Sequence, residues 1–237
     1  MPFHIEAASA PERFLITGDP DRASMFAERL LSGPELISRS RGFLVYRGEF
    51  RGVPVGIASH GIGGPSALIV AEELRQIGAR VFVRVGTAGS LTGELQVGDV
   101  VVLKGAGTTY GGAGLALYYP YGHCPPPSPD PELTLLLLEG ARAHGLRARL
   151  ALAFSSDSFY AEDPQTAEKL RSLGYQVVEM ECAGLLSLAN LRGLRAACAL
   201  VVSNLIGDRT RANAEALRPS LLGVASAALE ALISVKA

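Results

Sequence analysis

The sequence predicts an α/β protein, in which a single domain over residues 1–237 forms an α/β/α sandwich around a mixed, largely parallel central sheet. Short apolar runs alternate with helical patterns almost from end to end, and this alternation is typical of helices packed on both faces of a sheet. The chain has 237 residues, 48% of them hydrophobic, which suits one domain with a sizeable core.

The first half of the chain is expected to be rich in strands. Arg51-Gly52 is a polar turn between two apolar runs and predicts a hairpin. Leu68, Ala71 and Leu74 recur at three-residue steps and predict a helix that Gly78 closes. The expected elements are strands over 13–17, 42–50 and 53–59, a helix over 65–78, a strand over 81–85 that the glycines of 86–89 break, and a strand over 97–103.

The second half continues the alternation after a long interruption. Residues 105–131 are rich in Gly, Tyr and Pro, and a stretch of this length without periodicity is more often functional or interfacial than idle. Tyr118, Tyr119 and Tyr121 favour an interface, but the role of the stretch and of Cys124 stays open. The elements expected after it are helices over 132–144, 164–173, 181–191 and 219–235, and strands over 147–154, 176–178 and 196–202.

Composition excludes several classes of function. The formal net charge is −1, which removes the global positive charge that non-specific nucleic-acid binding needs. The longest apolar run, residues 133–138, is interrupted by Thr134, so we expect no membrane span. Three cysteines without C-x-x-C spacing, and no signal peptide, predict a reducing cytoplasm. Only three of the 22 basic residues are lysines, a skew that genome composition also produces.

Common catalytic motifs are absent from the sequence. The four histidines, His4, His60, His123 and His144, are scattered without H-E-x-x-H spacing, so no metal site is expected. No G-x-S-x-G elbow occurs. The glycines of 61–64 match neither a dinucleotide fingerprint nor a P-loop.

Charged residues at the ends of predicted strands give a sharper signal. Arg84 lies inside an apolar run, where an unpaired charge costs several kcal/mol to bury, so it must meet an anion. That anion is either a carboxylate of the protein or a bound ligand. Glu179 and Glu181 flank Met180 at a strand-to-helix junction, where one of them can cap the helix and two carboxylates can hold sugar hydroxyls.

Taken together, six segments resemble the hexameric nucleoside phosphorylases, a family that includes purine nucleoside phosphorylase, uridine phosphorylase and archaeal methylthioadenosine phosphorylase. The segments are Gly18-Asp19-Pro20-Asp21-Arg22, Arg41-Gly42-Phe43, residues 59–74 ending in Glu73-Leu74, Arg84-Val85-Gly86-Thr87, Ser156-Asp157-Ser158-Phe159-Tyr160 and Val178-Glu179-Met180-Glu181. The resemblance covers nearly the whole chain, and the archaeal branch is nearest. Leu68 departs from it, because the family's signature has a small residue there.

The resemblance implies a phosphorylase/hydrolase-like fold and a reaction in which inorganic phosphate cleaves an N-glycosidic bond to give a free base and a pentose 1-phosphate. Phosphate is then a co-substrate and no cofactor is needed. By similarity the phosphate-binding residues are Gly18, Arg22, Arg84 and Thr87, with Arg41 supplied by a neighbouring subunit. Bidentate pairing with phosphate would offset the burial of Arg84.

The same resemblance assigns the sugar and the base. Glu181 would hold the ribose hydroxyls and favour an oxocarbenium-like transition state, beside Met180, with His4 arriving from a neighbouring chain. The base-binding residues would be Phe159, Val178, Glu179 and Asn204. The catalytic residues are then Arg84, Glu181 and Asn204, in a homo-oligomer, expected to be a hexamer, built from dimers that share active sites.

Asn204 stands where the adenosine-cleaving relatives have an Asp that protonates the base. An amide cannot act as a general acid but can hydrogen-bond a 6-oxopurine, so we expect inosine and guanosine to be favoured over adenosine. Asp208, four residues on, is an alternative acid. Methylthioadenosine and uridine stay open as substrates, although residues 161–165, shortly after the Phe-Tyr pair, contain no Arg of the kind that the uridine-cleaving relatives have there. A hydrolytic nucleosidase and a non-catalytic nucleoside- or dinucleotide-binding module are the remaining alternatives, and the sequence does not distinguish ribose from deoxyribose.

Overall fold

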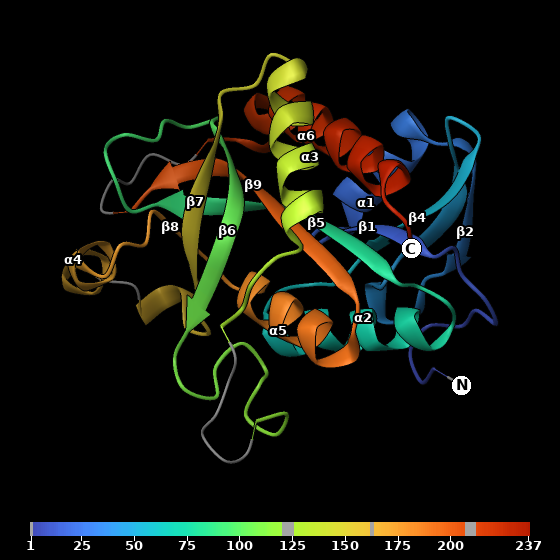
Figure 1. Cartoon of the computed structure of the whole chain (residues 1–237), viewed down its shortest axis with the longest axis horizontal. Coiled ribbons are helices and arrows are strands. Elements are labelled where there is room, and N and C mark those ends of the chain that lie inside the picture. Colours follow the sequence, from blue (N-terminus) through green and yellow to red (C-terminus); the bar gives the residue numbers. More distant parts are fainter. Residues whose placement is uncertain (1, 120–125, 162–163, 207–211) are drawn as a thin grey trace.

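A computed structural model describes residues 2–119, 126–161, 164–206 and 212–237. Helices lie on both sides of a central sheet, as the predicted sandwich requires (Figure 1). The strands are β1 (Arg13–Thr17), β2 (Ser32–Ser38), β3 (Val45–Phe50), β4 (Val53–Ser59), β5 (Val81–Ser90), β6 (Val100–Thr108), β7 (Ala148–Ser155), β8 (Val177–Glu179) and β9 (Arg195–Leu205). The helices are α1 (Pro20–Leu30), α2 (Gly64–Gln76), α3 (Pro131–Ala143), α4 (Pro164–Ser172), α5 (Cys182–Arg192) and α6 (Ala214–Ser234), with short 3₁₀ turns η1 (Ser40–Gly42) and η2 (Phe159–Ala161).

The described strands form one sheet in the order β2-β3-β4-β1-β5-β8-β7-β6-β9. Parallel pairings join β1 to β4 and β5, β5 to β9, and β7 to β6 and β8, while the others are antiparallel. The expected mixed, largely parallel sheet is therefore confirmed. Because β5 also pairs with β9, the strands β5, β8, β7, β6 and β9 close into a ring, with β5 as its link to the rest of the sheet.

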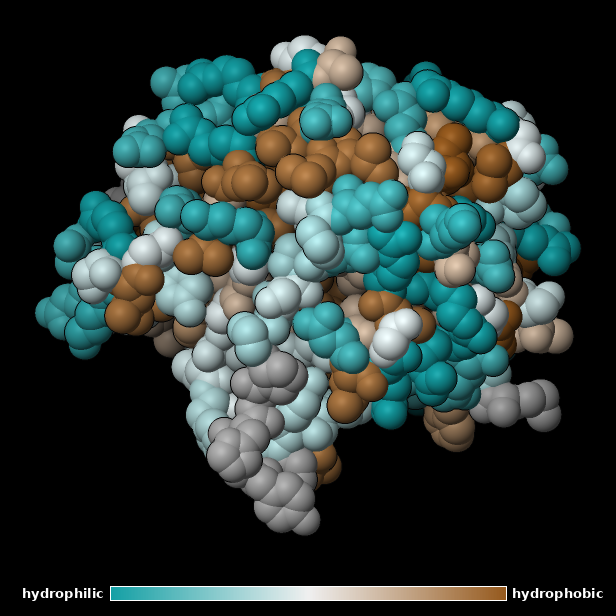
Figure 2. Space-filling model, in the orientation of Figure 1, coloured by the Kyte–Doolittle hydropathy of each residue, from teal (hydrophilic) through white to brown (hydrophobic). Residues whose placement is uncertain are grey.

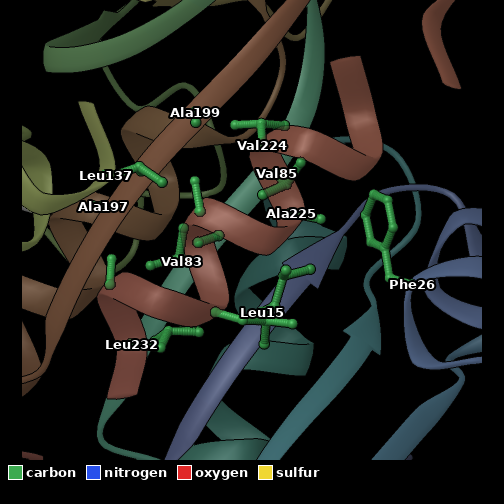
Figure 3. Packing of buried hydrophobic residues seen from close by; sticks show 14 of the residues in the cluster. Leu15, Phe26, Val83, Val85, Leu137, Ala197, Ala199, Val224, Ala225 and Leu232 are labelled. Carbon is green, nitrogen blue, oxygen red and sulfur yellow. The ribbon is translucent and has the colours of Figure 1, made fainter. Parts of the chain in front are cut away.

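Two apolar layers hold the helices to the sheet. One layer joins α1, α3 and α6 to one face, where Phe26, Leu137 and Val224 surround the strand residues Leu15 and Val83 (Figure 3). The other joins α2 and α5 to the opposite face. On the side of α3 and α6, hydrophobic side chains show between hydrophilic ones at the molecular surface (Figure 2).

The C-terminal helix begins earlier than the sequence suggested. Asn213 caps α6 by accepting a hydrogen bond from the Ala216 N–H at 2.8 Å, so Pro219 lies inside the helix instead of starting it. In the described part of the chain, α6 is the one helix whose length and hydropathy would suit a membrane span. Half of that apolar window is buried inside the protein, against β1, β5 and β9.

Other element boundaries also differ from the expectation. The glycines of 86–89 do not end β5, which runs on to Ser90 because its pairing with β9 continues through them. Strand β6 begins at Val100 and continues to Thr108, inside the stretch expected to be irregular. Helix α1 and strand β2 were not expected at all. The hairpin of β3 and β4 is confirmed.

Candidate active site

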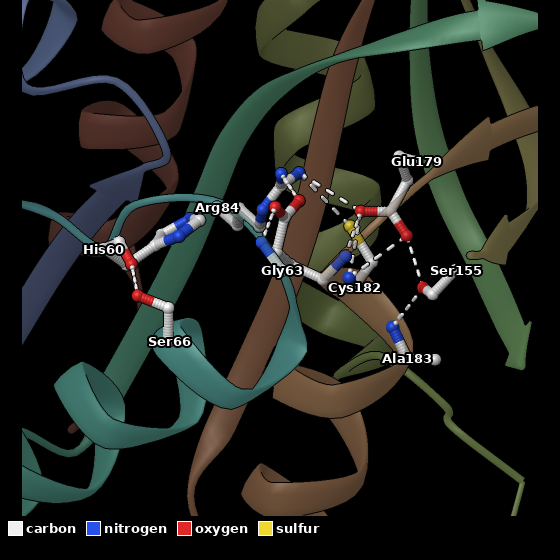
Figure 4. A network of polar contacts seen from close by, with 9 residues as sticks. His60, Gly63, Ser66, Arg84, Ser155, Glu179, Cys182 and Ala183 are labelled. Atoms are coloured by element: carbon white, nitrogen blue, oxygen red, sulfur yellow. Dashed lines mark hydrogen bonds and ion pairs between the residues drawn. The ribbon is translucent and has the colours of Figure 1, made fainter. Parts of the chain in front are cut away.

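The charged residues singled out in the sequence meet where β5 and β8 approach the first turn of α5. Arg84 lies within β5 and Glu179 ends β8 (Figure 4). Glu181 is the N-cap residue of α5. All three are buried, with 4–5% of their surface exposed. Three residues that the sequence singled out, nearly a hundred positions apart in the chain, therefore meet in the fold.

Arg84 is paired with carboxylates of the protein itself. Its Nη2 forms a short ion pair with Glu181, its Nη1 lies 3.5 Å from Glu179 Oε2, and Nη1 also donates to Cys182 Sγ at 3.4 Å. Burial by itself would lower the pKa of Arg84, but the attraction of Glu181 together with that of the other acidic groups around it outweighs the burial and raises the pKa. The Nε–H makes no hydrogen bond to any described residue.

Gly86 explains how this guanidinium is seated. The side chain of Arg84 folds back along β5 over Gly86, two residues further on the same face of the strand. A Cβ at position 86 would collide with both terminal nitrogens of Arg84. The glycine therefore leaves room for a close approach inside the strand, and it does not end the strand as the sequence suggested.

The two glutamates have different partners. Glu179 accepts hydrogen bonds from the backbone N–H groups of Glu181 and Cys182, each at 2.9 Å, and from the Ser155 hydroxyl, so it caps α5. Glu181 accepts one from the Gly63 N–H at 2.7 Å, across to the start of α2. Arg84 lowers the pKa of Glu181, despite the burial that opposes this. The sequence predicted that one of these two glutamates could cap the helix, and the structure shows that it is Glu179.

His60 is a member of this cluster that sequence reasoning set aside among scattered histidines. It follows β4 directly and is fully buried, next to Gly18. Burial, and then the charge of Arg84, lower its pKa to about 4, so the ring is neutral at pH 7. Neither ring nitrogen has a hydrogen bond of ordinary geometry to a described residue, and the same holds for the Thr17 hydroxyl. Its position after a strand, beside Gly61, was the available signal.

The remaining residues expected at the phosphate lie around the same edge of the sheet. Gly18 follows β1, and its carbonyl accepts the Gly61 N–H at 3.0 Å. Arg22 is in the first turn of α1, with its Nε 3.4 Å from Asp19 Oδ2. Thr87 is part of β5, half-buried. Arg41 is exposed in η1, at a φ of 54°.

Two of the residues expected at the base, Val178 and Asn204, lie on either side of Gly89. In register, Gly89 of β5 pairs with Val178 of β8 on one side and with Asn204 of β9 on the other. A Cβ at position 89 would collide with Ile206 Cδ1, 2.6 Å away, and would lie 3.3 Å from Asn204 Nδ2. Phe159, in η2, is 55% exposed, and the half-buried Met180 links Glu179 to Glu181. Asp208 lies outside the described residues.

His4 is tied to its own chain through Glu73 of α2. Its Nδ1 lies 2.7 Å from Glu73 Oε1, while the backbone N–H groups of His4 and Ile5 donate to Oε2 at 2.8 and 2.7 Å. The ring also meets Phe43 edge-on, two residues from Arg41. The two residues expected to serve a neighbouring subunit therefore belong to neighbouring parts of this chain.

Two buried thiols lie behind the cluster. Cys182 begins α5, and burial together with its hydrogen bond to Cys198 raises its pKa well above the ordinary value. Cys124 lies outside the described residues. A separate cavity of about 320 Å³ lies between Thr108, Tyr119, Pro127 and Tyr175, and none of the charged residues above lines it.

Comparison with known proteins places this geometry in a family. Residues 12–234 match the family described as the phosphorylase superfamily. The chain belongs to the phosphorylase superfamily. It is an enzyme, and the predicted class, a nucleoside phosphorylase and thus a pentosyltransferase, is confirmed.

Individual relatives of this phosphorylase cover most of its length. A DeoD-type purine nucleoside phosphorylase from Shewanella baltica is 33% identical over 239 residues, covering 98% of this chain and 97% of that protein. A uridine phosphorylase from Thermococcus kodakarensis is 34% identical over 217 residues, covering 85% and 76%. The crystal structure of purine nucleoside phosphorylase from Toxoplasma gondii in complex with immucillin-H has a TM-score of 0.88 and 27% identity, covering 98% of this chain and 95% of that one.

Proposed function

We propose that the chain is a purine nucleoside phosphorylase that uses inorganic phosphate to cleave the N-glycosidic bond of purine nucleosides, with inosine and guanosine favoured, and releases the free base and ribose 1-phosphate. One observation carries the proposal. The guanidinium of Arg84, which can bind an anion, lies directly against the carboxylate of Glu181, which can bind sugar hydroxyls. Both side chains are buried. Phosphate and sugar would meet where these two side chains meet.

The reaction needs opposite charges on two sides of one sugar carbon. A phosphate oxygen held by Arg84 forms the new bond to C1′, while the C1′–N bond breaks and its electron pair leaves with the base. Glu181 accepts hydrogen bonds from the sugar hydroxyls, and its negative charge stabilises the cationic ring as that charge develops. Because the pKa of Glu181 is lowered, it stays ionised throughout the neutral range. Gly18, Arg22 and Thr87 would complete the phosphate site, and no cofactor takes part.

The preference for a 6-oxopurine rests on Asn204. The Ser203 hydroxyl donates to Asn204 Oδ1 at 2.8 Å, which engages the amide oxygen and leaves the Nδ2 hydrogens to donate. Such a donor can stabilise negative charge at N7 and O6 of the leaving base, but it cannot deliver a proton. Val178 and Phe159 would supply the apolar contacts to the base.

Uridine phosphorolysis is the second candidate, because a uridine phosphorylase is among the similar proteins at 34% identity. Methylthioadenosine is a further alternative from the sequence. His4 and Arg41 would serve the site of a neighbouring subunit, in a cytoplasmic hexamer built from dimers. Their shared neighbourhood around Phe43 supports a common role.

A phosphorolysis panel tests the proposal. Base release from inosine, guanosine, adenosine, methylthioadenosine and uridine is measured with and without phosphate. We expect strict phosphate dependence and a higher kcat/KM for inosine than for adenosine. Asn204→Asp should shift the preference towards adenosine. Equal rates without phosphate would indicate a hydrolase, and a clear preference of the wild type for adenosine or uridine would refute the assigned base.

A further inference from the structure

The irregular stretch after β6 places one residue, Ala113, against the first turns of α2 and α5. Ala113 is fully buried although its neighbours form turns, and its backbone has a φ of 53°, a left-handed conformation that costs energy for any residue with a side chain. Segments that hold such a conformation are usually fixed by their surroundings for a purpose. The surroundings of Ala113 are the first turns of two helices.

Glycines on both helices make room for this backbone. A Cβ on Gly64, the first residue of α2, would collide with the carbonyl group of Ala113. A Cβ on Gly184, in the first turn of α5, would lie 2.5 Å from the same carbonyl oxygen. The turn is thus wedged between the N-termini of α2 and α5, where a carbonyl oxygen is also favoured by both helix dipoles.

The wedge lies next to the contact that holds Glu181. The N-cap residues of the two helices, Gly63 and Glu181, are joined by the hydrogen bond from the Gly63 N–H to Glu181 Oε1 at 2.7 Å. Gly63 directly precedes Gly64, and Glu181 lies three residues before Gly184; both Gly64 and Gly184 contact Ala113. The separation of the two helix starts, and with it the place of the Glu181 carboxylate, therefore depends on what fills the space between them.

Asp157 holds the wedge in place. Both of its carboxylate oxygens accept the Ala113 N–H, at 2.9 and 3.2 Å. Asp157 follows β7 and lies two residues before Phe159, which is expected to stack on the base. The Asp157 carboxylate thus connects the segment that carries Phe159 to the Ala113 turn between the starts of α2 and α5.

We propose that Asp157 is a positioning residue for nucleoside binding, which acts through Ala113 to set the place of Glu181 relative to Phe159. The inference rests on the proposed function, and it extends it to a residue that would touch neither substrate. The phosphate side depends on this contact less than the nucleoside side does. Arg84 and Thr87 belong to β5, whose backbone is fixed by pairing with its neighbours in the sheet, although the ion pair between Arg84 and Glu181 links the two sides.

The test compares Asp157→Ala with Asp157→Asn. Loss of a hydrogen bond of this kind changes an equilibrium by about tenfold, so Asp157→Ala should raise the KM for the nucleoside by about tenfold and leave the KM for phosphate within about twofold. Asp157→Asn keeps an acceptor oxygen for the Ala113 N–H and should restore most of the nucleoside affinity. Gly184→Ala approaches the wedge from the other side and should reproduce the effect of Asp157→Ala, although alanine favours a helix.

Asp130→Ala is the matched control. Asp130 also accepts a backbone N–H, that of Leu133 at 2.9 Å, but it caps α3 away from the site and is paired there with Arg195. This variant should lower the melting temperature without separating the two KM values.

Equal changes in both KM values, or none, in Asp157→Ala would overturn the inference, as would failure of Asp157→Asn to differ from Asp157→Ala. Wild-type protein that cleaves no nucleoside with phosphate would instead overturn the proposed function. In that case the inference is still decided by hydrogen exchange, because Asp157→Ala should speed exchange at the Gly63 amide while Asp130→Ala should not.

Discussion

Acidification should destabilise the protein through His60, since this imidazole is buried in its neutral form. Its pKa lies near 4 in the folded chain against an ordinary value of 6.5. Between these two values the unfolded chain binds a proton at this position that the folded chain does not. His60 therefore leaves the free energy of unfolding unchanged above pH 6.5. It lowers this free energy progressively as the pH falls from 6.5 to about 4, and lowers it no further below that.

The size of the effect follows from the two pKa values. The full difference between 6.5 and about 4 corresponds to about 3 kcal/mol, of which about 2 kcal/mol is lost at pH 5. Glu181 and Asp130, whose pKa values are lowered, also contribute less stability on acidification, as the pH falls towards their folded pKa values. A comparison with a variant is needed to isolate His60 from them.

Urea unfolding at pH 7.5 and pH 5.0 gives the measurement, with wild type and His60→Gln at equal protein concentration. Glutamine is polar and does not titrate, so the loss of unfolding free energy between the two pH values should be smaller in the variant by about 2 kcal/mol. The comparison is between the two pH-induced losses of unfolding free energy, so a loss of stability in His60→Gln that is equal at both pH values does not affect the result. The same loss in both proteins would refute the buried, neutral histidine.

Three further predictions concern the site and the fold. Arg84→Met should leave Glu181 without its cation and destabilise the protein by about 3–5 kcal/mol, which urea unfolding measures, and phosphorolysis should fall by more than about a hundredfold; near-wild-type activity would remove Arg84 from the phosphate site. Gly86→Ala should displace the guanidinium and raise the KM for phosphate by about tenfold with a smaller change in the KM for the nucleoside, and unchanged phosphate kinetics would contradict the close approach. Asn213→Ala should remove the cap of α6 and cost about 1 kcal/mol of unfolding free energy while kcat stays unchanged; a variant as stable as wild type would show that the cap contributes nothing.

The alternation of apolar runs predicted the fold class because a strand buried on both faces needs no polar residues. The same rule failed for β2, Ser32–Ser38, which is mostly exposed and therefore carries no apolar pattern. It failed again at residues 86–89 of β5. Glycine normally weakens a strand, but here the side chain of Arg84 packs against the backbone of Gly86, and that of Ile206 against the backbone of Gly89.

The charged part of the site was open to prediction from the sequence for an energetic reason. An arginine inside an apolar strand must be compensated, so the position of Arg84 in the sequence was enough to indicate an anion nearby. His60 and Ala113 gave no such signal. An alanine looks ordinary in a sequence, and for His60 the position after a strand was a weak signal, so the importance of both becomes clear from burial and from contacts across the fold.

The charges of the buried cluster also bear on how phosphate could be held. Arg84 faces two carboxylates, Glu179 and Glu181, and His60 adds no charge at pH 7. A single cation already shared between two anions is poorly placed to hold a dianion alone, since phosphate would be repelled by both carboxylates in a site of low dielectric constant. In the proposed reaction, Arg22 and Arg41 would therefore supply the excess positive charge. Glu181, unfavourable for the bound phosphate, becomes favourable once the sugar turns cationic, so the same charge that weakens phosphate binding would lower the barrier to bond cleavage.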